Sequence, residues 1–240
     1  MHLRVTLLLR ALAVLLGVLG SARLTLGVYA YRAANALERP AYTVLRTLSR
    51  GVELRRYAPY VIAETTVPTG SMRAASGQGF RSVAGYIFGK NTVSKRMAMT
   101  APVRLSQKTG GAQMKMTAPV RMAPGDDATR VSFVMERGFT PRNSPRPTDR
   151  AVRVRNVQPH ILAARTFNGP PPSEKRVARE RERLLDALEA DGLKPLQGAD
   201  GAQTLVYGYH DPFITPSFLR RNEVCVYVEE CAALRPAAPA

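Results

Sequence analysis

Apolar and polar residues alternate along several short segments of this chain, and this period-two pattern predicts β-strands with one buried face. The patterned segments are residues 52–63, 130–135, 152–163, 204–209 and 222–228. Pro59 and Pro159 interrupt two of them, so residues 52–63 and 152–163 are each predicted to form a strand, a turn and a second strand. We therefore expect a protein rich in short strands joined by turns.

Two longer segments have the three- to four-residue apolar spacing of an amphipathic helix. The first covers about residues 71–88, although Gly77 and Gly79 weaken its start. The second covers about residues 173–191 and begins at Ser173, a residue type that caps helix N-termini. The chain is therefore predicted to combine its strands with two helices.

The chain also repeats itself, because residues 52–63 match residues 152–163 at an offset of one hundred. In each half, the matching hairpin is followed by a predicted helix and then by further strands. The proline-rich residues 141–147 join the two halves. Two such units packed together predict an α+β protein with a mostly antiparallel, curved sheet and one helix against each half.

A shorter repeat is the motif MxMTAPVR, which occurs at residues 97–104 and 114–121. Gly110 and Gly111 between the copies supply the positive φ angles of a tight hairpin, so we predict that the copies are neighbouring antiparallel strands. The two methionines of each copy then share one face of their strand. Their thioether side chains suit a large flat apolar ligand or, alternatively, an irregular core. These residues are Met97, Met99, Met114 and Met116.

A predominantly apolar N-terminal run, residues 11–31, contains Arg23 as its single charged residue. The run is long enough to span a bilayer, which takes about 20 residues. Small residues at positions 20–22 also offer a site for a signal peptidase. We expect a membrane anchor or a cleaved signal peptide, and the alternative is the buried helix of a soluble protein.

The chain is accordingly predicted to divide into three parts. Residues 1–40 form the signal anchor or signal peptide, residues 41–230 form the folded domain and residues 231–240 form a disordered tail. The two cysteines, Cys225 and Cys231, do not fix the cellular compartment.

The net charge of +17 comes mainly from arginines that are scattered along the sequence, which favours a solvated surface over a single basic site. No zinc-finger spacing, basic zipper or RNA-binding strand signature occurs, so we expect no nucleic-acid partner. We expect the protein to be a monomer.

The doubled MTAPV motif, together with the sequence RRNEV at residues 220–224, resembles the SOUL haem-binding protein family. Further matching stretches are residues 52–64, 79–91 and 131–135, and the resemblance covers about residues 42–228. It implies a distorted antiparallel β-barrel from two pseudo-symmetric halves, about residues 42–140 and 150–230, with two flanking helices. This fold is similar to that of gyrase-inhibitory-type effector-binding domains.

The resemblance implies reversible, non-covalent binding of haem or a related tetrapyrrole, without chemistry. The better-known members of the family are soluble and eukaryotic, whereas this chain carries the N-terminal apolar run. That difference indicates a bacterial envelope protein, either anchored in the inner membrane with a periplasmic domain or exported.

The resemblance also points to the first helix and its neighbouring strands as the apolar slot for a small planar ligand. The slot residues are Phe80, Val83, Ile87, Met97 and Met99. Arg81 or Lys90 would contact the haem propionates; the alternative is that the apolar residues only fill the core. His160 and His210 are candidate axial ligands of the iron, but axial ligation is not carried over from the family.

Enzymatic signatures are weak in this sequence. It holds no HExxH, P-loop or nucleophile-elbow motif, which favours a binding protein over an enzyme. The alternative function is a small-molecule hydrolase or effector-binding domain of the gyrase-inhibitory-type fold. It would use strand carboxylates such as Glu64, Glu136 or Glu223 as acid or base. A purely structural, membrane-tethered interaction domain is a third possibility.

Overall fold

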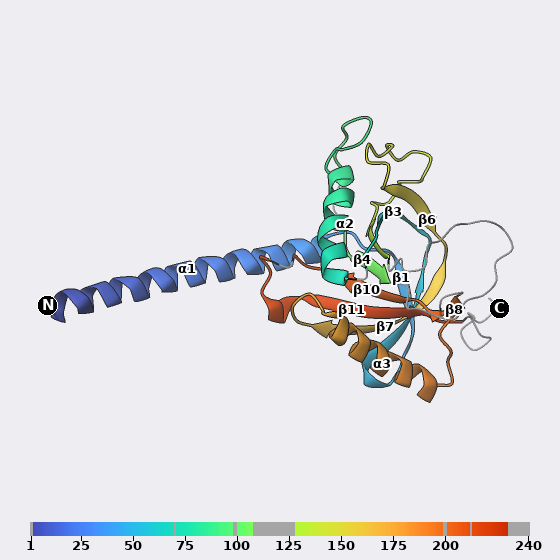
Figure 1. Cartoon of the computed structure of the whole chain (residues 1–240). Helices are drawn as coiled ribbons and strands as arrows, with labels where there is room; N and C mark the ends of the chain where they lie inside the picture. The colour runs from blue at the N-terminus through green and yellow to red at the C-terminus, as the bar shows by residue number, and fades with distance from the viewer. Residues whose placement is uncertain are drawn as a thin grey trace.

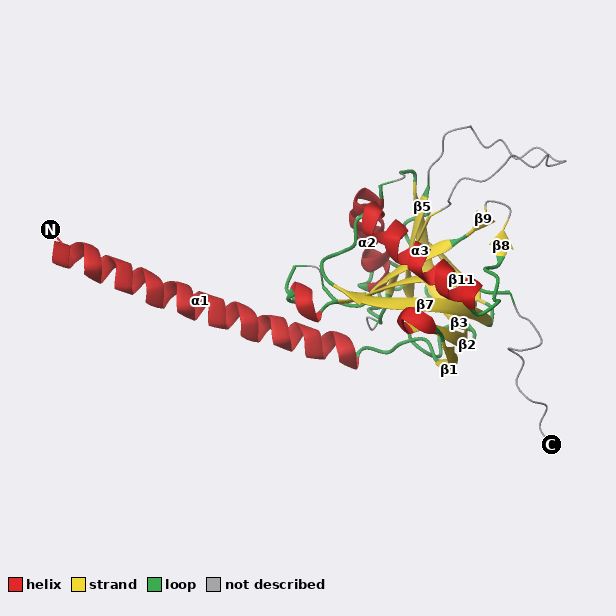
Figure 2. Cartoon of the chain, turned by 90° about the horizontal axis from the view of Figure 1, so that it is seen from below, coloured by secondary structure: helices red, strands yellow, loops and turns green. Residues whose placement is uncertain are grey.

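The structure is a computed structural model of the 240-residue chain, and it describes residues 2–69, 71–97, 100–107, 128–198, 201–211 and 213–229. A long helix, α1 (His2–Ala36), precedes a domain that contains a curled sheet and two further α-helices. Figures 1 and 2 show α1 projecting away from this domain. The predicted tail, residues 231–240, lies outside the described residues.

The main sheet of the described residues has nine antiparallel strands in the order β1-β2-β7-β11-β10-β4-β5-β3-β6. Its strands are β1 (Tyr42–Thr47), β2 (Val52–Tyr57), β3 (Tyr60–Val67), β4 (Val103–Gln107), β5 (Thr129–Val134), β6 (Arg153–Val157), β7 (His160–Asn168), β10 (Thr204–Gly208) and β11 (Arg221–Tyr227). Two short strands, β8 (Gln197–Gly198) and β9 (Gly201–Ala202), pair with each other outside this sheet. The predicted alternation of apolar and polar positions is therefore confirmed as strand structure.

The order of the strands is symmetric about the pairing of β4 with β10. The strands β2, β3, β4 and β5 of the first half correspond to β6, β7, β10 and β11 of the second half, in that order. If each strand is exchanged with its counterpart, the sheet order β2-β7-β11-β10-β4-β5-β3-β6 is reproduced in reverse. Each set consists of a hairpin, a helix and two further strands. This arrangement confirms the predicted α+β fold, a distorted antiparallel barrel from two pseudo-symmetric halves.

The two domain helices, α2 (Met72–Ile87) and α3 (Glu174–Ala190), begin where the sequence predicts. The hydroxyl of Ser71 accepts a hydrogen bond from the amide of Ala74, and that of Ser173 accepts one from the amide of Arg176, both at 3.3 Å. Each serine satisfies one of the amides that a helix N-terminus leaves without an intrahelical partner. Both predicted N-termini are therefore confirmed.

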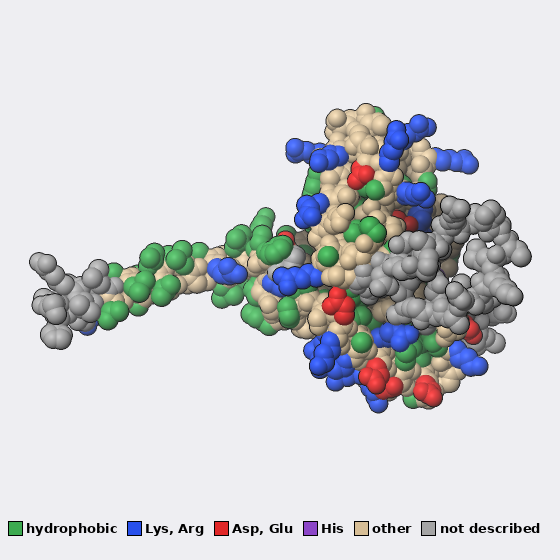
Figure 3. All heavy atoms as spheres, in the orientation of Figure 1, with side chains coloured by type: hydrophobic (Ala, Val, Ile, Leu, Met, Phe, Trp, Pro, Cys, Tyr) green, Lys and Arg blue, Asp and Glu red, His purple; other side chains and the backbone are tan. Residues whose placement is uncertain are grey.

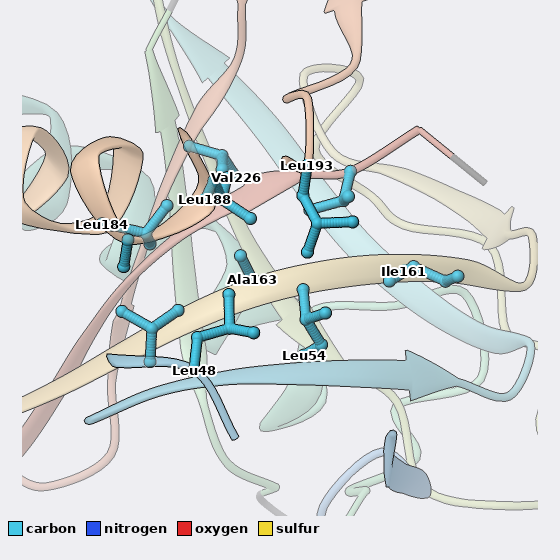
Figure 4. Close-up of a cluster of buried hydrophobic side chains, with 11 residues drawn as sticks. Leu48, Leu54, Ile161, Ala163, Leu184, Leu188, Leu193 and Val226 are labelled. Carbon is cyan, nitrogen blue, oxygen red and sulfur yellow. The ribbon is translucent and has the colours of Figure 1, made fainter. Parts of the chain in front are cut away.

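Both helices cover the same face of the sheet, which we call the outer face. α3 packs on Leu54, Ala163 and Val226 from three neighbouring strands (Figure 4). α2 packs on Ala63 of β3 and Phe133 of β5. The alternating residues of the same strands point to the opposite, inner face. Examples of inner-face residues are Tyr57, Leu162, Tyr207 and Cys225.

One prediction about the methionine repeat is wrong. Met97 lies in no strand; it precedes β4, which starts at Val103, and its side chain is buried beside α2. All five residues of β4 pair with β10 on one edge and with β5 on the other. Both edges of β4 are therefore occupied by strands other than the second copy of the motif, which was the predicted partner. Met99 and the second copy, residues 114–121, lie outside the described residues.

Candidate functional site

A cavity of about 350 Å³ opens on the outer face between the first turn of α2 and the side of α3. Its floor includes Leu105 of β4 and Val206 of β10, which are register partners at the centre of the symmetric sheet. Met72 of α2 and Val177 and Leu185 of α3 line its walls. The volume is at the lower end of the range for ligand pockets, about 300–1,000 Å³, and the lining is mainly apolar, as in most such pockets.

Of the residues that the structure describes, one cation lines this cavity, Arg181 on α3. Its Nε is buried and has no hydrogen-bond partner among the described residues. A buried polar atom without a partner is costly, so this guanidinium is poised to pair with a ligand group. A ligand that brings a carboxylate into the cavity would supply the missing acceptor.

Three carboxylates also lie around the cavity, and two of them are already engaged. Glu174 accepts a hydrogen bond from the amide of Met72 at 3.0 Å, which ties the start of α3 to the start of α2. Asp186 forms an ion pair with Arg50 at 2.5 Å. The third carboxylate, Glu182, lies one residue after Arg181 on α3. The described residues around the cavity thus carry three carboxylates against two arginines, Arg181 and Arg50, so the local charge is slightly negative before a ligand binds.

The residues of the predicted slot lie further along α2. Val83, Ile87 and Met97 are buried together and pack against β3 and β5. Phe80 is 40% exposed and lies edge-on to Phe133, with ring centroids 5.3 Å apart. Both predicted propionate contacts, Arg81 and Lys90, are exposed. The structure thus brings Val83, Ile87 and Met97 together as core packing, with Phe80 at the surface edge, while Met99 lies outside the described residues.

The inner face of the sheet is rich in tyrosine, arginine and buried acid. Glu223 on β11 is fully buried and accepts hydrogen bonds from Arg55, Arg221 and Tyr209. Burial alone raises the pKa of Glu223, but the positive charges of Arg55 and Arg221 outweigh that effect and hold the pKa below its ordinary value. Glu223 is therefore an ionised structural carboxylate rather than a free acid or base.

The other two carboxylates suggested for hydrolysis, Glu64 and Glu136, give the hydrolase function little support. Glu64 is held by a two-point ion pair with Arg155, at 2.6 and 3.0 Å. Glu136 follows β5 and is half-buried. Both carboxylate oxygens of Glu64 are thus already engaged by the guanidinium of Arg155.

The two candidate axial histidines differ in the tautomer that their contacts impose. Nδ1 of His160 lies 2.7 Å from the carbonyl of Gln158 and must donate to it, so Nε2 keeps its lone pair. Nδ1 of His210 accepts a hydrogen bond from the amide of Arg221 at 3.1 Å, so in the neutral ring Nε2 carries the proton. Of the two, His160 alone presents a nitrogen suited to a metal.

Neither histidine lines the cavity. The ring of His160 stacks on Tyr57 of the inner face, with centroids 5.3 Å apart, and His210 stacks on Tyr31 of α1. Burial lowers the pKa of both imidazoles, so both are neutral near pH 7. Among the described residues that line the cavity, the side chain of a type that ligates haem iron is the thioether of Met72.

Arg181 was not among the site residues predicted from the sequence. Its signal was present, however, because Arg181 lies four residues from both Val177 and Leu185 and so belongs to the apolar stripe of α3. A charged residue inside an apolar stripe indicates either a buried ion pair or a ligand contact.

Comparison with known proteins gives a family and a fold. The sequence profile of the family described as SOUL heme-binding protein matches residues 37–227. A comparison with curated protein sequences found no match. Among solved structures, the EcmrR chain of an EcmrR–DNA complex superimposes with a TM-score of 0.51 and 10% identity, covering 92% of this chain and 70% of that one.

A conserved protein of Listeria innocua gives a similar result. It superimposes with a TM-score of 0.51 and 8% sequence identity, and the match covers 74% of this chain and 92% of that one. At such low identity, both likenesses concern the fold alone.

Proposed function

This chain belongs to the SOUL heme-binding protein family, and from that membership we propose that it binds haem or a related tetrapyrrole in the cavity between α2 and α3. The observation that carries the proposal is the unpartnered Nε of Arg181 in a mainly apolar cavity. Apolar walls favour the macrocycle, and a guanidinium favours a propionate. The binding is non-covalent and serves no reaction of the protein itself.

The size and chemistry of the cavity constrain how such a ligand would bind. A volume of about 350 Å³ suits one edge of a macrocycle rather than the whole, so part of the ligand would stay exposed at the mouth. The thioether of Met72 is a soft ligand that haem iron accepts. Partial exposure and a single protein ligand fit reversible binding better than permanent storage.

The position of α1 supports a site at a membrane. Within the described residues, α1 contains the one helix that is long and apolar enough to cross a bilayer, Leu9–Ala36. We propose that α1 anchors the chain and that the binding domain faces the periplasm, with export after cleavage as the alternative.

The first experiment is a titration of the purified full-length chain in detergent with hemin. We expect a shifted Soret band that saturates near one equivalent. Ala178→Trp is expected to fill the cavity from an exposed position of α3 and to weaken binding by about tenfold or more. The matched control is Phe80→Ala on the flank of α2, which leaves the cavity intact.

Arg181→Gln tests the carboxylate contact. We expect it to weaken hemin binding by about tenfold and to leave binding of hemin dimethyl ester unchanged, since the ester has no free propionate. Arg179→Gln, an exposed arginine on the same helix, is the control. Non-saturating spectra with the wild-type chain would refute haem binding. Full binding by Ala178→Trp, combined with weak binding by Phe80→Ala, would place the site on the α2 flank.

A further inference from the structure

The segment between β10 and β11 exposes three large apolar side chains. Phe213 is 80% exposed, Phe218 is 66% exposed and Ile214 is 44% exposed. None of them lines the cavity between α2 and α3. We call this segment, residues 209–211 and 213–220, the β10–β11 loop. Apolar residues clustered at one surface mark an interaction site.

The β10–β11 loop is packed against α1. Gly27 of α1 is buried, and a Cβ at this position would lie 2.7 Å from Pro216 and 3.1 Å from the carbonyl oxygen of Ile214. One turn further along α1, Tyr31 stacks on His210 with ring centroids 5.0 Å apart and planes 12° apart. Because two successive turns of the helix contact the loop, the loop is fixed at the level of Gly27.

That level matters if α1 crosses a bilayer. Residues 11–31 lie between Arg10 and Arg32 and span about 31 Å, close to the hydrocarbon core of about 30 Å. Arg32 is exposed and would sit at the polar boundary next to the domain. Gly27 lies five residues before it, about 7 Å deeper. The β10–β11 loop therefore reaches the depth where apolar side chains meet lipid.

We propose that the β10–β11 loop is a second membrane contact. Its side chains Phe213, Ile214 and Phe218 insert into the leaflet on the domain side of the membrane, where α1 emerges. The partner is the headgroup and upper acyl region of an anionic phospholipid bilayer. Figure 3 shows hydrophobic side chains along α1 and again where it meets the domain, with Lys and Arg side chains beside that junction. Arginines near an anionic surface are attracted to it, which favours this side of the domain lying on the bilayer.

The consequence is a fixed orientation of the domain. A domain that is held by a single helix can rotate about the connection to that helix. A second contact beside the helix fixes which face of the domain lies toward the membrane. The inference goes beyond tetrapyrrole binding and does not depend on it; it rests on retention of α1 in the membrane.

The chain contains no tryptophan, so one introduced tryptophan reports its own depth. We would prepare Phe213→Trp and Phe218→Trp in the full-length chain and confirm retention of α1 by intact mass. Each would be reconstituted into phosphatidylcholine–phosphatidylglycerol vesicles with and without brominated acyl chains. The control is Leu196→Trp, at a 48% exposed position just before β8, which Figure 1 places at the end of the domain opposite α1.

We expect the emission of the Phe213→Trp and Phe218→Trp variants to be blue-shifted and quenched by brominated lipid, while that of Leu196→Trp is unchanged. Equal quenching at all three positions, or none at Phe213→Trp, would overturn the proposal, as would recovery of only a chain that has lost α1. Adding Gly27→Leu to Phe213→Trp separates the loop from α1 and should reduce the quenching. Unchanged quenching in this double variant would refute the role of the helix contact in setting the depth of the loop.

Discussion

Arg55 on β2 and Glu223 on β11 form an ion pair on the inner face of the sheet, with Nη1 of the arginine 3.0 Å from both carboxylate oxygens. Both side chains are almost completely buried, at 1% and 0% exposure. The two strands are separated by β7 in the sheet, so the pair ties together strands from the two halves of the fold. Breaking such a pair is costly because the remaining charge has no solvent.

Glu223→Gln should therefore strongly destabilise the protein. It removes the buried counter-charge of Arg55 and leaves this guanidinium with the more exposed Glu53 alone, and we expect a loss of about 3–5 kcal/mol in the free energy of unfolding. The measurement is urea denaturation of the full-length chain in detergent. Glu53→Gln is the control, because Glu53 also pairs with Arg55 but has a side chain that is 38% exposed. Its cost should stay below about 1 kcal/mol; equal costs for both variants would contradict the argument.

The same carboxylate makes stability depend on pH. The pKa of Glu223 lies below its ordinary value of 4.5, because the arginines outweigh the effect of burial. The folded state therefore binds this proton less readily than the unfolded state does. Its stabilisation is complete above the ordinary pKa and is lost as the pH falls through the lower, folded pKa. We expect the difference in unfolding free energy between wild type and Glu223→Gln to shrink below about pH 4.5, and a constant difference would refute the assignment.

Two glycines of α2 should respond in opposite directions to alanine. At Gly79 an added Cβ would lie 2.5 Å from a methyl group of Val131 on β5, so Gly79→Ala must push the helix from the sheet. We expect a loss of about 1–3 kcal/mol despite the better helix propensity. At Gly77 the nearest atom is 3.8 Å away, the guanidinium of Arg81, and Gly77→Ala should stabilise the protein by up to about 1 kcal/mol. Thermal denaturation of both variants tests this prediction: the melting temperature should fall for Gly79→Ala and rise for Gly77→Ala.

This contrast shows which parts of the fold were readable from the sequence. The strands, the start of each helix and the N-cap of Ser173 were predicted from local chemistry, since such a serine acts on an amide three residues away. Gly79 looked like a weakness in the helix because its role depends on Val131, which is distant in the sequence. Met97 was misplaced for a related reason, because a buried segment outside a strand has the same apolar character as a strand.

The candidate site was harder to predict than the fold. The cavity is assembled from α2, α3 and the central strands, and no single motif marks such a junction. The sequence around Arg181 did hold a local signal, because a charged residue interrupts the apolar stripe of α3. Whether such a residue forms an ion pair or lines a cavity depends, however, on the elements packed against the helix. The methionine motif drew attention to Met97, whereas in the described part of the chain it is Met72 that lines the cavity.

The two histidines give a test of where a haem would bind. Neither lines the cavity, so His160→Ala and His210→Ala should leave the Soret maximum and spin state of the hemin complex unchanged. Met72→Leu, which keeps the volume but removes the sulfur, should change the spectrum if the thioether contacts the iron. A changed spectrum with His160→Ala would instead place the ligand on the inner face, where Nε2 of His160 is buried without a partner among the described residues.

The buried thiol of Cys225 should be chemically inert. It lies on β11 between Leu205 of β10 and Ala164 of β7 and is fully buried. Burial, strengthened by the charge of Glu223, raises the pKa of this thiol well above its ordinary value, so the reactive thiolate is scarce at pH 8. In a Cys231→Ser background, Cys225 should react with a thiol reagent on the order of 10³-fold more slowly in buffer than in urea.

The matched control for this labelling adds Leu196→Cys, at a position that is 48% exposed, to a Cys225→Ala, Cys231→Ser chain. That thiol should react at similar rates in buffer and in urea, because it is accessible in both states. If Cys225 reacts in buffer as fast as this control, the centre of the sheet opens without global unfolding. That result would contradict the close packing of β11 between β7 and β10, on which the buried ion pair of Arg55 and Glu223 also depends.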